Sequence, residues 1–290
     1  MLQIKGFRAA LLGIFLLSLL GVQLNAKAEK QTVYVIPVEK NVEQGLASFL
    51  SRSLQDAKDA HADHIILDIN TPGGLVKSAI DMADLITESE IPVTAYVNKR
   101  ALSAGAYIAL QADHIYMAPG GKMGAAAIVD GQGNAADQKA QSLWLAEMED
   151  AAVKNNRDPK YALAMADPDI DAKEVGAPKG DLLTLNADKA IEVGYSEGTA
   201  DNLSTLVKKL GFEKAQISYA KESFAEKTAR WLTNPVIVPI LLTIAFLGLT
   251  VELFPRVSAS LERLDSLRYC CSFTGILQPA LPGMRRFSSL

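Results

Sequence analysis

The feature that most constrains the fold is an alternation of strand-like and helix-like segments in the first third of the chain. Residues 33–38 alternate and are rich in β-branched side chains, and residues 64–69 and 92–97 form two further apolar strand-like runs. Between them, residues 43–60 and 75–89 carry apolar side chains at helical spacing. This alternation predicts an α/β fold with a buried parallel sheet, in which ligands bind beyond the carboxyl ends of the strands.

Two short motifs fall at these carboxyl ends. The run at residues 64–69 leads into Pro72-Gly73-Gly74, which we interpret as a turn whose glycines leave backbone amides uncovered. Ser103 stands among small residues, directly before a run that can begin a helix. A serine in this place is commonly a helix N-cap. Beside exposed amides it can instead be a nucleophile with an oxyanion hole, and these residues alone leave both interpretations open.

A third motif follows in order, Met-Ala-Pro-Gly at residues 117–120 and Gly-Ala at residues 124–125. Together with residues 68–74 and 103–107, it resembles the membrane-bound ClpP-class serine proteases of the NfeD type, over about residues 32–254. The resemblance implies a crotonase/ClpP-like spiral of strand-strand-helix units and peptide-bond hydrolysis by a Ser-Lys dyad. It also implies a stomatin- or flotillin-like membrane protein as substrate or partner, and assembly into dimers or larger homo-oligomers.

A serine hydroxyl needs a base, and the residue inventory favours lysine over histidine. The chain has three histidines, His61, His64 and His114. The first two precede a predicted strand and are expected near its far end, and no histidine follows His114, so a Ser-His triad does not fit. A lysine can serve, because burial disfavours its charged form and lowers its pKa.

Among the lysines near enough in sequence, Lys139 is the first candidate and Lys122 the alternative. Lys139 stands where the loop after Gly131 becomes a helix, which matches the position of the catalytic lysine in the family. A solvated lysine on a first helical turn is the other interpretation of this residue. The stretch from Gly124 to Lys139 is a few residues shorter than is usual in the family, and this keeps Lys122 open.

The resemblance thus implies Ser103 and Lys139 as catalytic residues, with Gly73, Gly74 and Ala104 forming the oxyanion hole through their backbone N–H groups. Neither a metal nor a cofactor is expected, because the sequence has no cysteine or histidine cluster with metal-ligand spacing and no phosphate-binding loop.

Composition sets the remaining limits. A length of 290 residues, 49% of them hydrophobic, allows one catalytic domain and membrane segments. A net charge of −4 and the absence of a basic run argue against a nucleic-acid partner. We place the protease domain at residues 29–221.

Both ends of this domain carry membrane-related patterns. Residues 1–28 read as a secretory signal peptide, with an uncut anchor as the alternative, and either delivers the domain to the periplasmic or extracellular side of the membrane. Residues 222–234 are charged and amphipathic, as suits a juxtamembrane segment. Residues 235–254 are almost continuously apolar and long enough for one transmembrane helix, with a buried core helix as the alternative.

The resemblance stops after residue 254. Residues 255–290 are rich in arginine and serine and show no usable period. Reading one frame over permits a continuation like that of the family, so we expect a frameshifted, aberrant and disordered tail.

Two other functions remain to be weighed. A crotonase-like acyl-CoA enzyme would use a similar oxyanion hole, but the predicted signal peptide counts against it. A non-catalytic membrane scaffold with this fold, partnering a stomatin- or flotillin-like protein, is the alternative to a protease. The presence of Ser103, Gly73 and Lys139 counts against that alternative.

Overall fold

The computed structural model describes residues 31–232 and 237–252 of the chain. The predicted signal peptide at residues 1–28 and the predicted aberrant tail at residues 255–290 lie outside the described residues. The chain falls into two units, and the boundary between them lies directly after Lys227.

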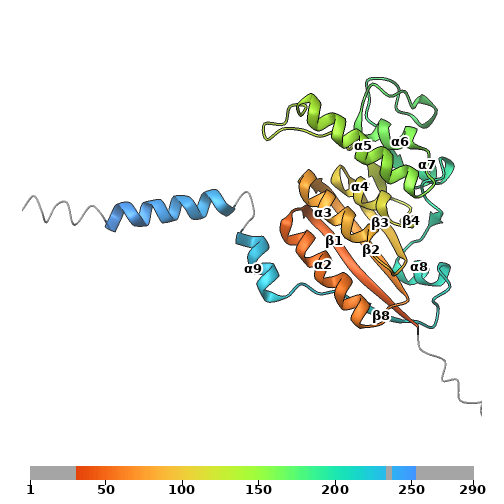
Figure 1. The fold of residues 1–290 in the computed structure, drawn as a ribbon, viewed down its shortest axis with the longest axis horizontal. Coiled ribbons are helices and arrows are strands. Elements are labelled where there is room, and N and C mark those ends of the chain that lie inside the picture. The colour runs from red at the N-terminus through yellow and green to blue at the C-terminus, as the bar shows by residue number, and fades with distance from the viewer. Residues whose placement is uncertain (1–30, 233–236, 253–290) are drawn as a thin grey trace, which may run out of the picture. The chain divides into compact units, whose positions relative to one another are not determined.

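The first unit is built from one sheet and the helices that pack on it (Figure 1). Its strands are β1 (Thr32–Val42), β2 (His64–Gly74), β3 (Val93–Leu102), β4 (His114–Met117), β5 (Lys122–Gly124), β6 (Thr184–Asn186), β7 (Gly198–Thr199) and β8 (Gln216–Tyr219). Its helices are α2 (Gln44–Asp59), α3 (Val76–Thr87), α4 (Ala104–Gln111), α5 (Gln138–Lys154), α6 (Pro159–Ala166), α7 (Ala187–Glu192) and α8 (Leu203–Lys209). A final helix, α9 (Phe224–Leu232), crosses into the second unit.

The sheet confirms the predicted parallel arrangement. Its strand order is β6-β5-β3-β2-β1-β8, and all pairs are parallel except β5 with β6. The long strand β3 pairs with β4 over its first half and with β5 at its end, where Leu102 lies opposite Gly124. The carboxyl ends of β2, β3 and β5 therefore meet at one edge of the sheet.

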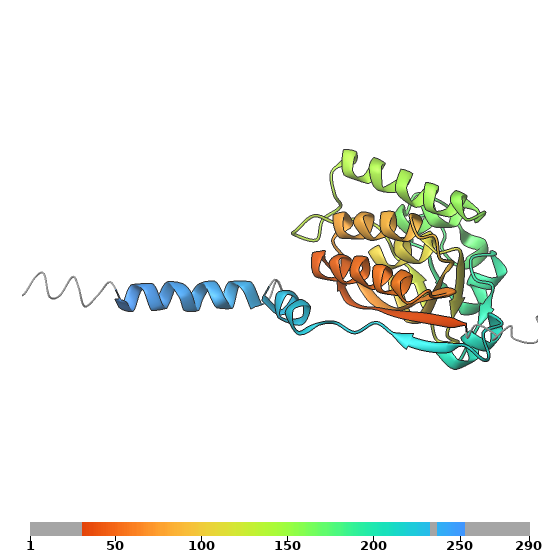
Figure 2. The same ribbon diagram turned by 60° about the horizontal axis from the view of Figure 1, so that its bottom comes forward.

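Two apolar clusters fix the layers. On one face of the sheet, Ile65, Leu67 and Ile69 of β2 are fully buried under α2, α3 and α4, which lie side by side over the sheet (Figures 1 and 2). On the other face, Ile66 packs in a smaller cluster with residues of α8 such as Leu206. Burying a side chain of this size contributes about 1.5 to 3 kcal/mol. Since both faces of β2 are buried, its near-continuous apolar run is what a central parallel strand requires.

Most elements follow the predicted pattern, and α5 begins at Gln138, next to Lys139, where the sequence predicted that a loop becomes a helix. Its start is fixed by Asp137, whose carboxylate accepts a hydrogen bond from the Ala140 N–H at 3.1 Å. The prediction of a turn at Pro72-Gly73-Gly74 was wrong, because β2 continues through these residues and pairs with β1 as far as Gly74.

Other differences concern short segments. The sequence did not predict β5, β8 or α6. The turn within the loop at residues 130–137 is closed by hydrogen bonds. The Asp130 carboxylate accepts from the backbone N–H groups of Gln132 and Asn134, and Val129 and Ala135 form a β-bridge.

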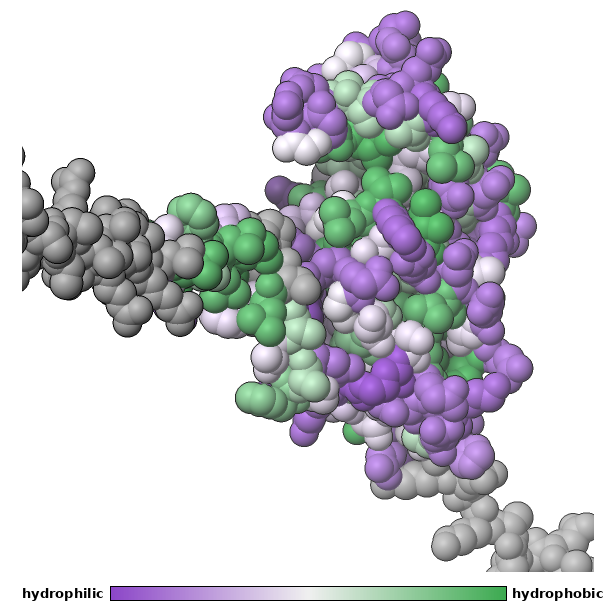
Figure 3. Space-filling model, turned by 60° about the vertical axis from the view of Figure 1, so that its left-hand side comes forward, coloured by the Kyte–Doolittle hydropathy of each residue, from purple (hydrophilic) through white to green (hydrophobic). Residues whose placement is uncertain are grey.

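The second unit contains a helix at Ile237–Glu252, most of whose large hydrophobic side chains are exposed. Figure 3 shows hydrophobic residues gathered on the helices that follow the domain, while hydrophilic residues dominate the domain surface in this view. Within the described residues, no single helix is long and apolar enough to cross a membrane. Taken together as a bent pair, α9 and this helix have the length and the apolar composition of a span. The predicted span at residues 235–254 extends beyond the described helix at both ends.

An ion pair holds the start of α9 against α2. The Arg52 guanidinium donates to both carboxylate oxygens of Glu226, at 2.7 and 2.9 Å, and also to the Lys221 carbonyl at 2.9 Å. Glu226 in turn accepts from the Ser223 N–H at 2.6 Å, as in a capping box. The hydrogen bond to Arg52 lowers the pKa of Glu226 to about 2. The pair therefore persists at any pH above about 4.

We expect the Glu226→Gln substitution to loosen the start of α9, because a neutral amide cannot form the charge-assisted pair with Arg52. Hydrogen exchange over residues 221–232 should become a few fold faster, as fits a pair that is partly open to solvent. The same substitution at the exposed Glu213 is the control and should leave these amides unchanged. Equal exchange in the wild type and in Glu226→Gln would show that the ion pair does not hold the helix.

Candidate active site

Ser103 links β3 directly to α4 in a strained backbone conformation. Its φ of 54° and ψ of −123° lie outside the regions that non-glycine residues ordinarily adopt. The Ser103 N–H donates to the Gly124 carbonyl of β5 at 2.9 Å, which holds this turn in place. Although Ser103 occupies the N-cap position of α4, its side chain makes no capping hydrogen bond. The N-cap interpretation therefore does not account for this serine, and a strained strand-to-helix turn is typical of a presented nucleophile.

Gly73 leaves room for the Ser103 side chain. Its φ is +106°, and a Cβ added at Gly73 would lie 2.6 Å from the Ser103 Cβ and 3.1 Å from its Oγ. The same Cβ would lie 2.9 Å from the Leu102 carbonyl oxygen. Both the backbone conformation and the space therefore require glycine, and the hydroxyl of Ser103 lies directly over the backbone at Gly73.

Thr71 organises this part of the site, and the sequence analysis missed it. Its side chain is fully buried, and its hydroxyl donates to the Lys40 carbonyl of β1 at 2.5 Å. The same oxygen accepts from the Gly73 N–H at 3.0 Å. Its methyl group packs on Gly105 of α4, where an added Cβ would come within 2.5 Å of it. Thr71 thus connects β1, Gly73 near the end of β2, and the helix that follows Ser103.

The backbone amides at the end of β2 point in two directions. The Gly73 N–H turns to Thr71, and the Leu75 N–H donates to the Val42 carbonyl of β1 at 2.8 Å, so both face the side of β1. In the parallel bridge between Val42 and Gly74, the Gly73 carbonyl faces β1. The Gly74 N–H points opposite to that carbonyl across a trans peptide, so it faces the side on which β3 lies. Of the two glycines predicted for the oxyanion hole, Gly73 supplies space and Gly74 directs its amide toward the strand that leads to Ser103.

Ala104 is the first residue of α4. The N–H groups of the first helical turn have no carbonyl partner within their helix, and the helix dipole favours negative charge at this end. The Ala104 amide therefore lies directly beside Ser103, at an end of α4 that stabilises an anion.

Lys139 lies on the first turn of α5, and its side chain is exposed. The helices α4 and α5 run in the same direction, because Tyr107 contacts Trp144 and the later residue Leu110 contacts Asn155. With a rise of about 1.5 Å per residue, Ser103 lies about 6 Å before Tyr107, and Lys139 about 7.5 Å before Trp144. The structure thus brings Ser103 and Lys139 to the same end of two packed helices.

The other candidate lysine is placed differently. Lys122 is exposed on β5, opposite Arg100 of β3 and two residues before Gly124. Lys154 lies at the far end of α5, where its ammonium group donates to the Thr87 hydroxyl at 2.6 Å. Lys122 therefore stays an alternative base, whereas Lys154 is held away from Ser103.

The histidines lie far from the nucleophile. His64 and His114 stand at the amino ends of β2 and β4, whereas Ser103 follows the carboxyl end of β3. His64 is buried with its Nε2 2.8 Å from the Thr94 hydroxyl, and burial lowers its pKa to about 4. His114 lies 3.3 Å from Glu197. These positions support the exclusion of a histidine base.

Over residues 31–232 and 237–252, the structure contains no group of three or more histidine, cysteine, aspartate or glutamate side chains arranged to hold a metal ion. The groups that the described site offers for chemistry are a hydroxyl, an ammonium group and directed backbone amides. This set suits acyl transfer.

Comparison with protein families decides where the chain belongs. A family model described as NfeD1b, N-terminal domain, matches residues 32–220, which include the entire sheet. The chain belongs to the NfeD1b family. Over 246 residues it is 26% identical to the membrane-bound protease PH1510 of Pyrococcus horikoshii. That alignment covers 77% of the NfeD1b chain and 53% of the relative, so the chain spans about half the length of this curated relative.

Solved structures confirm the predicted fold. The NfeD1b chain is similar to a mutant of the 1510-N membrane-bound stomatin-specific protease in complex with a substrate peptide, with 25% identity and a TM-score of 0.61, covering 71% of this chain and 99% of that one. A second structure, the 1510-N membrane protease specific for a stomatin homolog from Pyrococcus horikoshii, gives 25% identity and a TM-score of 0.56, covering 71% and 100%. The predicted α/β fold is thus shared with a membrane protease.

The geometry at Gly73 makes a prediction about stability. We expect Gly73→Ala to lower the free energy of unfolding by at least about 1 kcal/mol, because alanine meets both an unfavourable φ and the Ser103 side chain. Gly120→Ala is the matched control, since an added Cβ there meets no atom within 4 Å. Chemical denaturation of the full chain in detergent, followed by circular dichroism, measures the difference. If the two variants are equally stable, Gly73 is not under the constraint described.

Proposed function

We propose that this chain is a membrane-anchored serine endopeptidase that uses a Ser103-Lys139 dyad. The observation that carries the proposal is the positive φ of Ser103, at a turn where Gly73 leaves room for its hydroxyl. A strained serine that caps nothing is costly for stability, and such strain concentrates at functional sites. Homology to a membrane-bound protease supports the same conclusion.

In the proposed reaction, the Ser103 Oγ attacks a peptide carbonyl while neutral Lys139 accepts the hydroxyl proton. The backbone N–H groups of Ala104 and Gly74 stabilise the oxyanion, with Gly73 leaving space for it. Removing one such donor typically costs about 3 to 4 kcal/mol of transition-state stabilisation. Lys139 then returns the proton to the leaving amine, and water hydrolyses the acyl-enzyme.

The exposure of Lys139 in a single copy sets a requirement on this mechanism. A lysine acts as a base only when it is neutral at the working pH, and removal from water favours that form. We therefore propose that the bound substrate, or a second copy in a homo-oligomer, covers Lys139 when the site is active.

We further propose that the substrate is an apolar segment of a stomatin- or flotillin-like membrane protein. The 1510-N relative is described as specific for a stomatin homolog. This chain has a cavity of about 300 Å³ that is lined in part by residues 127–129, which follow Gly124 in the sequence. Most of its lining residues are apolar, among them Ile128, Trp144 and Leu145. Such a cavity suits a large apolar side chain of a bound peptide.

The membrane placement belongs to the same proposal. A signal peptide at residues 1–28 and a transmembrane helix at residues 235–254 would hold the domain on the periplasmic or extracellular side. Exposed hydrophobic side chains along Ile237–Glu252 support an apolar environment for that helix.

The test is hydrolysis of apolar peptides, including stomatin C-terminal segments, by the full chain in detergent or vesicles. We expect Ser103→Ala to lower kcat/KM by about a thousandfold or more and Lys139→Ala by about a hundredfold or more, with unchanged circular dichroism. Lys122→Ala is the matched control and should keep a rate near that of the wild type.

Each other outcome leads to a definite conclusion. Loss of activity in Lys122→Ala with retention in Lys139→Ala would move the base to Lys122. Hydrolysis that is unchanged in Ser103→Ala would end the serine protease proposal, and a folded chain without hydrolysis in any assembly state would favour the non-catalytic scaffold.

A further inference from the structure

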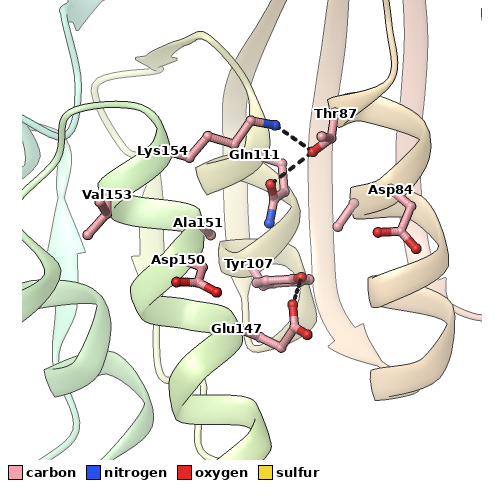
Figure 4. Close-up of a pocket in the computed structure, with 10 residues that line it drawn as sticks. Asp84, Thr87, Tyr107, Gln111, Glu147, Asp150, Ala151, Val153 and Lys154 are labelled. Atoms are coloured by element: carbon pink, nitrogen blue, oxygen red, sulfur yellow. Dashed lines mark hydrogen bonds between the residues drawn. The ribbon is translucent and has the colours of Figure 1, made fainter.

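A partly buried hydrogen bond joins the helix that begins after Ser103 to the helix that carries Lys139. The Tyr107 hydroxyl of α4 donates to the Glu147 carboxylate of α5 at 2.6 Å (Figure 4). Tyr107 is 2% exposed, and its pKa is raised by burial and by the hydrogen bond to Glu147. The two residues follow the candidate catalytic residues by one helical turn on α4 and about two turns on α5.

A second contact reinforces this junction through Trp144. The Trp144 ring lies against the Tyr107 ring with centroids 4.9 Å apart, and its Nε1–H donates to the Ala126 carbonyl at 2.7 Å. Ala126 comes two residues after Gly124, which accepts the Ser103 N–H. A closed set of contacts thus connects Ser103, Tyr107, Trp144 and the segment after β5.

The surroundings of the Tyr107–Glu147 bond are polar and partly open. A cavity of about 370 Å³ lies between α3, α4 and α5, with Tyr107 among its lining residues (Figure 4). Its charged lining residues are Asp84 of α3 and Glu147, Asp150 and Lys154 of α5. In the described contacts, Lys154 bonds Thr87 and not Glu147, so the hydroxyl of Tyr107 is the group that fixes the Glu147 carboxylate.

We propose that Tyr107 and Glu147 are positioning residues that set the distance and orientation of Lys139 relative to Ser103. The exposed first turn of α5 does not fix Lys139 by burial, so its position depends on how α5 is held against α4 farther along. Between α4 and α5, the Tyr107–Glu147 hydrogen bond and the Tyr107–Trp144 ring contact lie toward Ser103. The Leu110–Asn155 hydrogen bond lies at the opposite end of the two helices. This inference rests on the proposed Ser103-Lys139 dyad.

The decisive variants change the bond and keep the packing. Tyr107→Phe removes only the hydroxyl and leaves the ring on Trp144. Glu147→Gln keeps an oxygen that accepts from Tyr107, whereas Glu147→Leu does not. Asn155→Ala is the matched control, because it removes a 2.8 Å hydrogen bond between the same two helices at the end remote from Ser103.

We expect Tyr107→Phe and Glu147→Leu to lower kcat by about tenfold to a hundredfold with KM changed less than about twofold, because a small displacement of a catalytic group has effects of this size. Glu147→Gln should restore kcat to within about threefold of the wild type, since it still accepts the hydrogen bond. Asn155→Ala should keep the wild-type kcat. All rates are measured on the full chain with an apolar peptide, beside thermal unfolding of each variant.

A double substitution separates positioning from general destabilisation. In a Lys139→Ala background, Tyr107→Phe should cause no further loss in the rate at which a fluorophosphonate probe labels Ser103, because the two changes act through one group. A further loss there, or equal loss of kcat in Asn155→Ala and Tyr107→Phe, would overturn the inference. If Ser103→Ala and Lys139→Ala abolish hydrolysis while Tyr107→Phe does not reduce it, the inference fails and the proposed function stands. If Ser103→Ala and Lys139→Ala leave hydrolysis unchanged, the proposed function itself fails.

Discussion

The hydrogen bond from the Ser103 N–H to the Gly124 carbonyl is the contact on which the candidate site depends. It joins β3 to β5 at the residue where the backbone takes its unusual conformation. On the other side of Ser103, Thr71 ties β2 to β1 and holds the Gly73 amide. The surroundings of the serine are therefore set by the register of four neighbouring strands. Groups held in this way lose little energy to reorganisation when charge develops in a reaction.

The sequence predicted those parts of the fold whose apolar periodicity is long enough to read. In β2, the apolar run from Ile65 to Ile69 identified a strand of a buried parallel sheet, and the helical spacing at residues 43–60 and 75–89 identified α2 and α3. The sequence did not predict β5, because a strand of three residues is too short to show a period. It also failed for α6, whose alanine-rich sequence is buried on several sides and so lacks an amphipathic pattern. The continuation of β2 through Pro72 depends on pairing with β1, which local turn rules do not anticipate.

The candidate site shows the same division between local and long-range information. Ser103 and Gly73 stand in short motifs that a single sequence shows, whereas Lys139 was named through the resemblance to the NfeD family. The role of Thr71 depends on Lys40, 31 residues earlier, and no local pattern reports that contact. Likewise, the opposite directions of the Gly73 and Gly74 amides follow from the pairing of β2 with β1, which only the folded chain defines.

The backbone strain at Ser103 has a consequence for the evolution of this chain. Holding a non-glycine residue at this φ costs on the order of 1 to 3 kcal/mol, which the rest of the domain must offset. A glycine in this place would relax the turn, so the same fold without its hydroxyl would be the more stable one. Drift toward stability alone would remove the serine. Under the proposed function, the hydroxyl is what keeps a serine in this strained turn, at a cost in stability.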